Sequence, residues 1–197
     1  LHQRLRLLHQ LCQIILVMLL QMHFEQQEKV SVTEYTKMIE LKTAALLSGS
    51  VTIGARLAGA SEEDINRLDR FATEVGIAFQ LQDDLLDSFG DERLGKKIGG
   101  DILEGKKTYL MIMAMSHANE EQREVLRTTH LRSDLSDDEK IATIKALYES
   151  LNIRSLTEQQ ITLRINRALS ILETVSVEPS RTEQMRRYVE SLVGRNY

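Results

Sequence analysis

The amino-acid sequence predicts an all-helical protein, and three observations support this fold class. Only 5% of the 197 residues are aromatic although 42% are hydrophobic, a balance typical of long helices packed through aliphatic side chains. A single proline leaves few positions at which a helix is forbidden. No linker rich in Pro, Gly or Ser divides the sequence. We therefore expect one domain, residues 1–197, built as a bundle of long, mostly antiparallel helices.

The first expected helix covers residues 5–27, which contain neither Pro nor Gly and are apolar on almost every face. Its most apolar run, residues 14–20, is much shorter than the roughly 20 residues that span a bilayer. We therefore favour a buried helix over a signal sequence and expect no stable insertion into a membrane. The absence of an initiating Met indicates a chain that begins inside a longer natural sequence.

Two further helices are expected in the next part of the chain. Ser31 or Thr33 can cap the first of them, which should end near Gly49. The small residues of SGSVTIGARLAGA, residues 48–60, follow and are expected to let two helices approach closely. Ser61 is the predicted N-cap of the second helix, because three acidic residues occupy its first turn, and this helix should reach Asp87.

The C-terminal part begins with glycines that interrupt the periodicity between residues 88 and 105, which predicts the one long irregular segment. Helical patterns then return. We expect helices over residues 107–117, 120–128, 137–150 and 156–175, and a last helix from Pro179 to near Gly194.

Charge and cysteine content exclude several classes of function. The net charge is -4 and the basic residues are scattered, so nucleic acid is not an expected partner. The single cysteine, Cys12, can form neither an internal disulfide nor a CxxC metal motif. A cytoplasmic protein is therefore expected.

The segment FQLQDDLLD, residues 79–87, concentrates acidic residues on one face of a predicted helix. At about 100° per residue, Asp83, Asp84 and Asp87 fall within an arc of about 100° that also contains Gln80. Carboxylates this close repel one another unless a cation lies among them, and oxygen ligands suit Mg²⁺. Apolar neighbours upstream favour a face turned toward a cavity. The alternative is a solvated acidic face.

A basic, glycine-rich segment follows the acidic face. Lys96, Lys97, Lys106 and Lys107 alternate with glycines there, so ammonium groups and free backbone N–H groups can approach an anion. An acidic cluster followed by such a segment indicates a diphosphate bridged by metal on one side and by lysines on the other.

Three ordered blocks, YTKMIELKTAALL, FQLQDDLLD and LGKKIGGDILEGKKTY, resemble the trans-isoprenyl diphosphate synthases, the polyprenyl synthetase family of farnesyl and geranylgeranyl diphosphate synthases. The similarity covers about residues 24–115, and MRRYVESLVGRNY is similar to the family's last helix. The resemblance implies a helical bundle around a central cavity. It also implies a dimeric, Mg²⁺-dependent prenyltransferase that condenses isopentenyl diphosphate with an allylic diphosphate into a longer isoprenyl diphosphate.

The resemblance also implies roles for individual residues, all within the three blocks. Asp83 would bind Mg²⁺ directly, and Asp84 and Asp87 directly or through water. Lys42 and Lys96 would hold the allylic diphosphate. Thr43 and Gln80 would place oxygen dipoles beside the allylic cation. The remaining substrate-binding positions would be Phe79, which lines the isopentenyl site, and Asp101 and Lys106 in the downstream segment.

Two departures from the family pattern leave more than one interpretation. The family's first aspartate-rich motif is absent from the sequence, and Met18 and Gln21 occupy positions where the family has Gln and Asp. The chain is then either a piece of a synthase or a degenerate, non-catalytic homologue that binds metal-diphosphate or a partner subunit. Both predict an exposed apolar surface that associates with another chain. A purely structural helical bundle is the alternative from a different class.

Overall fold

A computed structural model of the chain describes residues 24, 27, 29–90 and 98–193. This part of the chain contains helices and no strand, which confirms the predicted all-helical class. The elements are α2 (Val32–Ile39), the π-helical turn η1 (Glu40–Ala44), α3 (Ala45–Leu57), α4 (Glu62–Phe89), α5 (Gly100–Leu103), α6 (Tyr109–His117), α7 (Glu120–Thr128), the 3₁₀ turn η3 (Thr129–Leu131), α8 (Asp137–Ser150), α9 (Ile153–Leu172) and α10 (Pro179–Val193).

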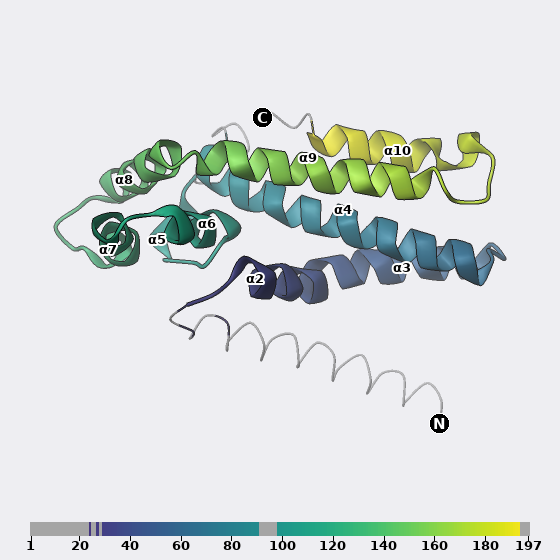
Figure 1. Cartoon of the computed structure of the whole chain (residues 1–197), viewed down its shortest axis with the longest axis horizontal. Helices are drawn as coiled ribbons and strands as arrows, with labels where there is room; N and C mark the ends of the chain where they lie inside the picture. The colour runs from purple at the N-terminus through teal and green to yellow at the C-terminus, as the bar shows by residue number, and fades with distance from the viewer. Residues whose placement is uncertain (1–23, 25–26, 28, 91–97, 194–197) are drawn as a thin grey trace, which may run out of the picture.

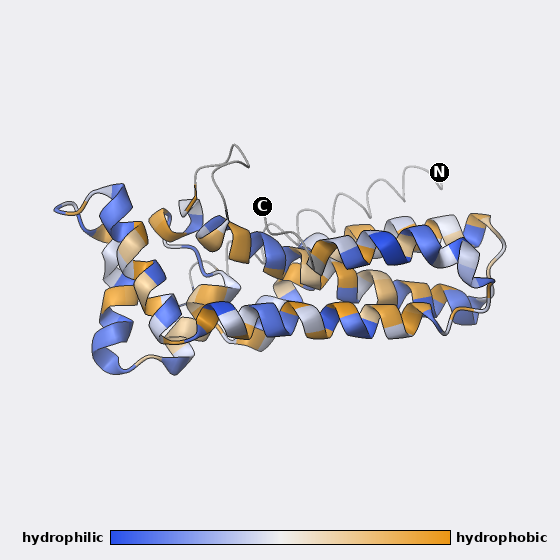
Figure 2. Cartoon of the chain, turned by 90° about the horizontal axis from the view of Figure 1, so that it is seen from above, coloured by the Kyte–Doolittle hydropathy of each residue, from blue (hydrophilic) through white to orange (hydrophobic). Residues whose placement is uncertain are grey.

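The long helices α3, α4, α9 and α10 lie side by side, and each runs antiparallel to the long helix that precedes it in the sequence (Figure 1). The 28-residue α4 is central: it packs against α3 on one side and α9 on the other, and α10 returns along α9. The shorter helices α5 to α8 gather around the C-terminal end of α4. Figure 2 shows the same elongated arrangement after a quarter turn, with polar and apolar positions intermixed along the long helices. The antiparallel bundle is confirmed.

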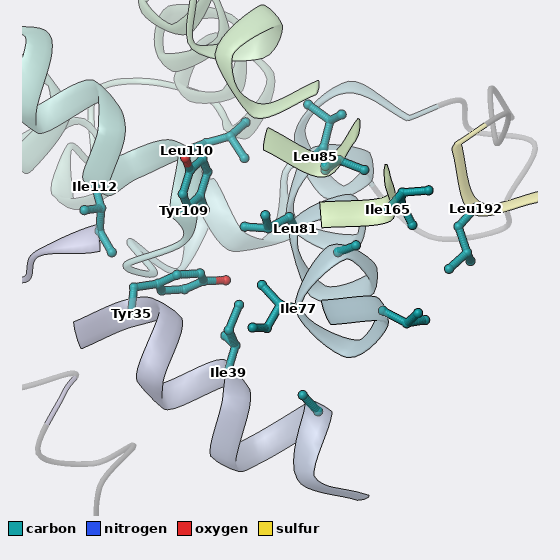
Figure 3. Packing of buried hydrophobic residues seen from close by; sticks show 14 of the residues in the cluster. Tyr35, Ile39, Ile77, Leu81, Leu85, Tyr109, Leu110, Ile112, Ile165 and Leu192 are labelled. Atoms are coloured by element: carbon teal, nitrogen blue, oxygen red, sulfur yellow. The ribbon is translucent and has the colours of Figure 1, made fainter. Parts of the chain in front are cut away.

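The core is organised around the buried face of α4. Ile77, Leu81 and Leu85 recur every four residues, and each is buried. Figure 3 shows these residues within one cluster of buried side chains from several elements, which includes Tyr35, Ile39, Tyr109, Leu110, Ile112, Ile165 and Leu192. Burial of one such aliphatic side chain contributes about 1.5–3 kcal/mol, so these contacts hold α2, α6 and α9 against α4.

Local signals set most helix boundaries. The Ser61 side chain accepts a hydrogen bond from the Asp64 N–H, so the predicted N-cap of α4 is confirmed, and the helix continues two residues past Asp87. Ser31, not Thr33, caps α2 through a capping box with Glu34. The bounds of α7 and α8 and the start of α10 at Pro179 also agree with the prediction.

Two predictions about helix ends were wrong. The helix expected to end near Gly49 continues through η1 and α3 to Leu57. Helix α9 begins at Ile153, earlier than expected, because Asn152 adopts the left-handed conformation (φ 56°) and breaks the chain direction after α8. The segment predicted to be irregular contains a short helix, α5, which was not expected because glycines interrupt the helical pattern there. The helix predicted over residues 5–27 and the end near Gly194 lie largely outside the described residues.

The predicted close approach of helices at residues 48–60 does not occur at the glycines of this segment. An added Cβ at Gly49 or Gly54 would meet no atom within 4 Å. The close approach occurs instead at Gly76 of α4, where a Cβ would lie 2.6 Å from the Ala44 Cα. Ala44 is fully buried, so the small residue that matters is on α4 and faces the π-helical turn.

No helix in the described part of the chain is long and apolar enough to cross a membrane.

Candidate functional site

The π-helical turn η1 carries Lys42 and Thr43. The Ala45 N–H donates to the Glu40 carbonyl, five residues earlier, which widens the helix there. In a regular α-helix, Thr43 is eight residues after Tyr35 and would lie about 80° away from it around the helix axis. The wider π-helical turn makes this angle smaller. Thr43 Oγ1 consequently donates a hydrogen bond to Gln80 Oε1 of α4 at 3.0 Å.

Asp84 is the buried centre of the acidic face. Its Oδ2 accepts hydrogen bonds from the Tyr35 hydroxyl at 2.5 Å and from the Tyr109 backbone N–H at 2.9 Å. Its Oδ1 accepts from Gln80 Nε2 at 3.1 Å. Burial raises the pKa of Asp84 to about 6, although each of these three hydrogen bonds lowers it. Burial also raises the pKa of Tyr35, and the Asp84 charge adds to this, so the hydroxyl stays protonated as a donor.

Asp87 anchors the glycine-rich segment to the end of α4. Its Oδ2 accepts from the Asp101 N–H at 2.9 Å, and its carbonyl oxygen accepts from the Gly99 N–H at 2.6 Å. Gly99 has a φ of 82°, a conformation that favours glycine. Asp101 Oδ1 in turn lies 2.5 Å from Lys106 Nζ, and this bond is the main cause of the raised pKa of Lys106. Asp87, Asp101 and Lys106 therefore form a second connected group.

Asp83 and Lys42 differ from these residues because both are exposed. Among the residues that the structure describes, neither side chain makes a hydrogen bond or an ion pair. Phe79 is 40% exposed on the same helix as Asp83. These three side chains are thus accessible to a ligand. Lys96 lies outside the described residues, so its assignment stays a prediction.

The three aspartates do not converge on one point. Over residues 29–90 and 98–193, no three His, Cys, Asp or Glu side chains are grouped closely enough to hold a metal ion. The donor set nevertheless fits Mg²⁺, which uses one or two carboxylates and retains water or takes substrate phosphate at its other positions. Asp83 is an exposed carboxylate on this face.

An apolar groove of about 270 Å³ lies between α3, α4 and α10. None of the predicted site residues lines it. Its lining includes Leu47 and Val75, each one helical turn from a predicted site residue, together with Val51, Phe71, Gln184, Met185, Tyr188 and Val189.

Tyr35 and Tyr109 are contacts of the site that the sequence did not identify. The only signal was position: Tyr35 begins the block YTKMIELKT, and Tyr109 ends GKKTY. Tyr35 also packs its ring against Phe24 and Tyr109, with centroids 6.1 Å apart in each pair. Lys107 makes a structural contact instead, because its ammonium donates to the carbonyls of Phe24 and Gln27.

Comparison with known proteins agrees with these blocks. The model of the polyprenyl synthetase family matches residues 4–151, more than half of the chain. A short chain isoprenyl diphosphate synthase of Methanocaldococcus jannaschii is 37% identical over 152 residues, which cover 76% of this chain and 46% of the relative. A geranylgeranyl diphosphate synthase of Sulfolobus acidocaldarius is 43% identical over 106 residues, which cover 53% of this chain and 32% of the relative.

Solved structures of such proteins share the fold. A geranylgeranyl pyrophosphate synthase matches with a TM-score of 0.85 and 33% identity over 94% of this chain and 58% of its own. A decaprenyl diphosphate synthase from Rhodobacter capsulatus matches with a TM-score of 0.82 and 27% identity, over 94% of this chain and 57% of its own. The chain matches between about a third and a half of the length of these curated relatives, 46% of the first and 32% of the second.

Proposed function

Because the chain belongs to the polyprenyl synthetase family, we propose that it acts in a Mg²⁺-dependent prenyltransferase. The reaction is the condensation of isopentenyl diphosphate with an allylic diphosphate to give a longer isoprenyl diphosphate. One observation carries this proposal: Asp83, exposed and without a partner among the described residues, lies one turn from Gln80, whose side chain is fixed by Thr43 and Asp84. A metal ligand and a rigid polar group thus adjoin on α4.

Asp83 and Lys42 are the proposed contacts to the diphosphate end of the substrate. When bound to Asp83, Mg²⁺ stabilises the negative charge that develops on the leaving diphosphate. Lys42 is exposed and has no acidic partner among the described residues, so its ammonium can pair with a phosphate oxygen. We keep Lys96 as a second cationic contact, as the family resemblance implies.

Thr43 and Gln80 are proposed to face the allylic cation. The Thr43 proton is used in the bond to Gln80, which leaves the lone pairs of the Thr43 oxygen for a developing positive charge. Gln80 is held at both ends, since its amide nitrogen donates to Asp84. Fixed dipoles of this kind stabilise a charge without the cost of reorienting at the moment of reaction.

The remaining predicted residues are proposed to complete the substrate site. Phe79 offers an accessible apolar surface beside Asp83 for the isopentenyl group. The ion pair of Asp101 with Lys106 orders the segment that follows Asp87, and Asp84 and Asp87 contact metal-held water at most, because both are buried and hydrogen-bonded. The single cysteine supports a cytoplasmic location.

We also propose that the chain associates with a second copy. Helix α3 exposes Leu46, Ile53 and Leu57, which are 77%, 62% and 85% accessible. These positions recur on one side of the helix, and such an apolar stripe is typical of a surface that packs against another chain.

The test of the proposed activity is extraction and counting of prenyl product from the purified chain, radiolabelled isopentenyl diphosphate, geranyl diphosphate and Mg²⁺. We expect Asp83→Ala to lower turnover by about 100-fold or more, as removal of a transition-state charge stabiliser does. Asp138→Ala, which removes an exposed carboxylate of α8, is the matched control and should leave turnover unchanged. Full turnover by Asp83→Ala would refute the metal role, and ligand binding without turnover in wild type would favour the non-catalytic alternative.

A further inference from the structure

Asp83 and Asp84 are adjacent in sequence, but Asp84 is buried and Asp83 is exposed. Three donors from α2, α4 and the start of α6 already bind the two Asp84 oxygens. A carboxylate has about four acceptor positions, so most of those on Asp84 are occupied by protein groups. Asp83 is exposed, and none of its acceptor positions is used within the described residues.

Tyr35 closes a loop of hydrogen bonds around Asp84. Its hydroxyl binds Asp84, Asp84 binds Gln80, and Gln80 binds Thr43. Thr43 lies on the same continuous helical run as Tyr35, so the backbone of α2 and η1 completes the loop. A shift of any one side chain in such a loop displaces the others.

We propose that Tyr35 is a positioning residue for the metal-diphosphate site. Its hydroxyl holds Asp84 in the interior, and Asp84 holds Gln80 and Thr43 in their orientation toward the ligand. Asp83 is then the member of the adjacent pair that reaches the metal. This inference rests on the proposed function, and it gives Asp84 a role other than the direct metal ligation that the resemblance left open.

If Tyr35 only stabilised the fold, its ring and not its hydroxyl would matter. Its ring packs against Phe24 and Tyr109, and that contact alone would stabilise the fold. Tyr35→Phe keeps the ring and removes only the hydroxyl that binds Asp84. Tyr148→Phe is the matched control, since Tyr148 is also a buried tyrosine and its ring packs against Phe89, outside this loop of hydrogen bonds.

The experiment is isothermal titration of the chain with inorganic diphosphate in the presence of Mg²⁺, which measures binding independently of turnover. We expect Tyr35→Phe to weaken binding by about fivefold to tenfold, because the lost bond is one to a charged group and its effect reaches the ligand through Gln80 and Thr43. Tyr148→Phe should bind within twofold of wild type. Equal losses in the two variants, or unchanged binding in Tyr35→Phe, would overturn the positioning role.

A second pair of variants decides the proposal even if Tyr35→Phe does not fold. Asp84→Asn keeps an oxygen that can accept from Tyr35 and Tyr109 and loses only the bond from Gln80 Nε2, so it should retain binding within about tenfold. Asp83→Asn should lose measurable binding. Equal losses in these two variants would make Asp84 a metal ligand and overturn the inference while leaving the proposed function intact. Absence of binding in wild type would overturn both.

Discussion

The close contact between Gly76 of α4 and Ala44 of the π-helical turn allows a quantitative prediction of the stability lost when Gly76 is enlarged. In Gly76→Ala the new Cβ would lie 2.6 Å from the Ala44 Cα and 2.7 Å from its Cβ. Overpacking costs about 1–3 kcal/mol, and the upper end applies because one neighbour is backbone. The better helix propensity of alanine returns about 1 kcal/mol. The expected net loss is therefore about 2 kcal/mol, or roughly 4–8 °C in Tm for a chain of this size.

Gly54→Ala is the matched control for this prediction. It makes the same change inside α3, where an added Cβ meets nothing within 4 Å. Its stability should rise by about 0.5–1 kcal/mol, so the two variants shift the urea midpoint in opposite directions. A Gly76→Ala protein at least as stable as wild type would refute the close packing of η1 on α4. It would also remove the structural basis for the Thr43 to Gln80 bond.

Further predictions concern the caps, the buried carboxylate and the exposed stripe. Ser61→Ala removes the N-cap of α4 and should cost about 1 kcal/mol in urea unfolding, whereas Ser50→Ala, at an exposed helix position, should change stability by less than about 0.5 kcal/mol. Asp84 has a pKa raised from 3.8 to about 6, so the folded protein binds a proton that the unfolded chain releases, and this stabilising contribution is lost as pH rises through 6. In metal-free buffer the stability of wild type relative to Asp84→Asn should therefore fall by about 2 kcal/mol between pH 4 and 7.5, and a constant difference would contradict the raised pKa. Leu57→Glu on α3 should reduce self-association in sedimentation velocity, and an unchanged sedimentation coefficient would exclude this stripe as the interface.

Much of the fold was readable from the sequence because its signals are local. Ser61 with its first-turn acids and Pro179 each mark a helix start through chemistry within a few residues. The π-helical turn at Lys42 and Thr43 has no such signal. It depends on the space that Gly76 leaves on a different helix, and sequence spacing does not reveal which glycine faces a neighbour.

The sequence predicted which helix carries the site but not how exposed each of its aspartates is. Helical periodicity correctly places Asp83, Asp84 and Asp87 on a single helix. It cannot distinguish their environments, because the groups that bury Asp84 come from far away in sequence: Tyr35 is 49 residues before it and Tyr109 is 25 after it. A helical wheel therefore presents three equivalent carboxylates where the fold provides one exposed and two buried.

The proposed site on α4 can be tested by thermal unfolding with Mg²⁺ and inorganic diphosphate, added separately and together. A ligand at 100 times its Kd stabilises the folded state by about 2.7 kcal/mol. We predict a rise in Tm only when both are present, its loss in Asp83→Asn, and its retention in Asp138→Asn. An unchanged Tm at saturating concentrations of both, or the same rise in Asp83→Asn, would contradict a metal-diphosphate site at Asp83.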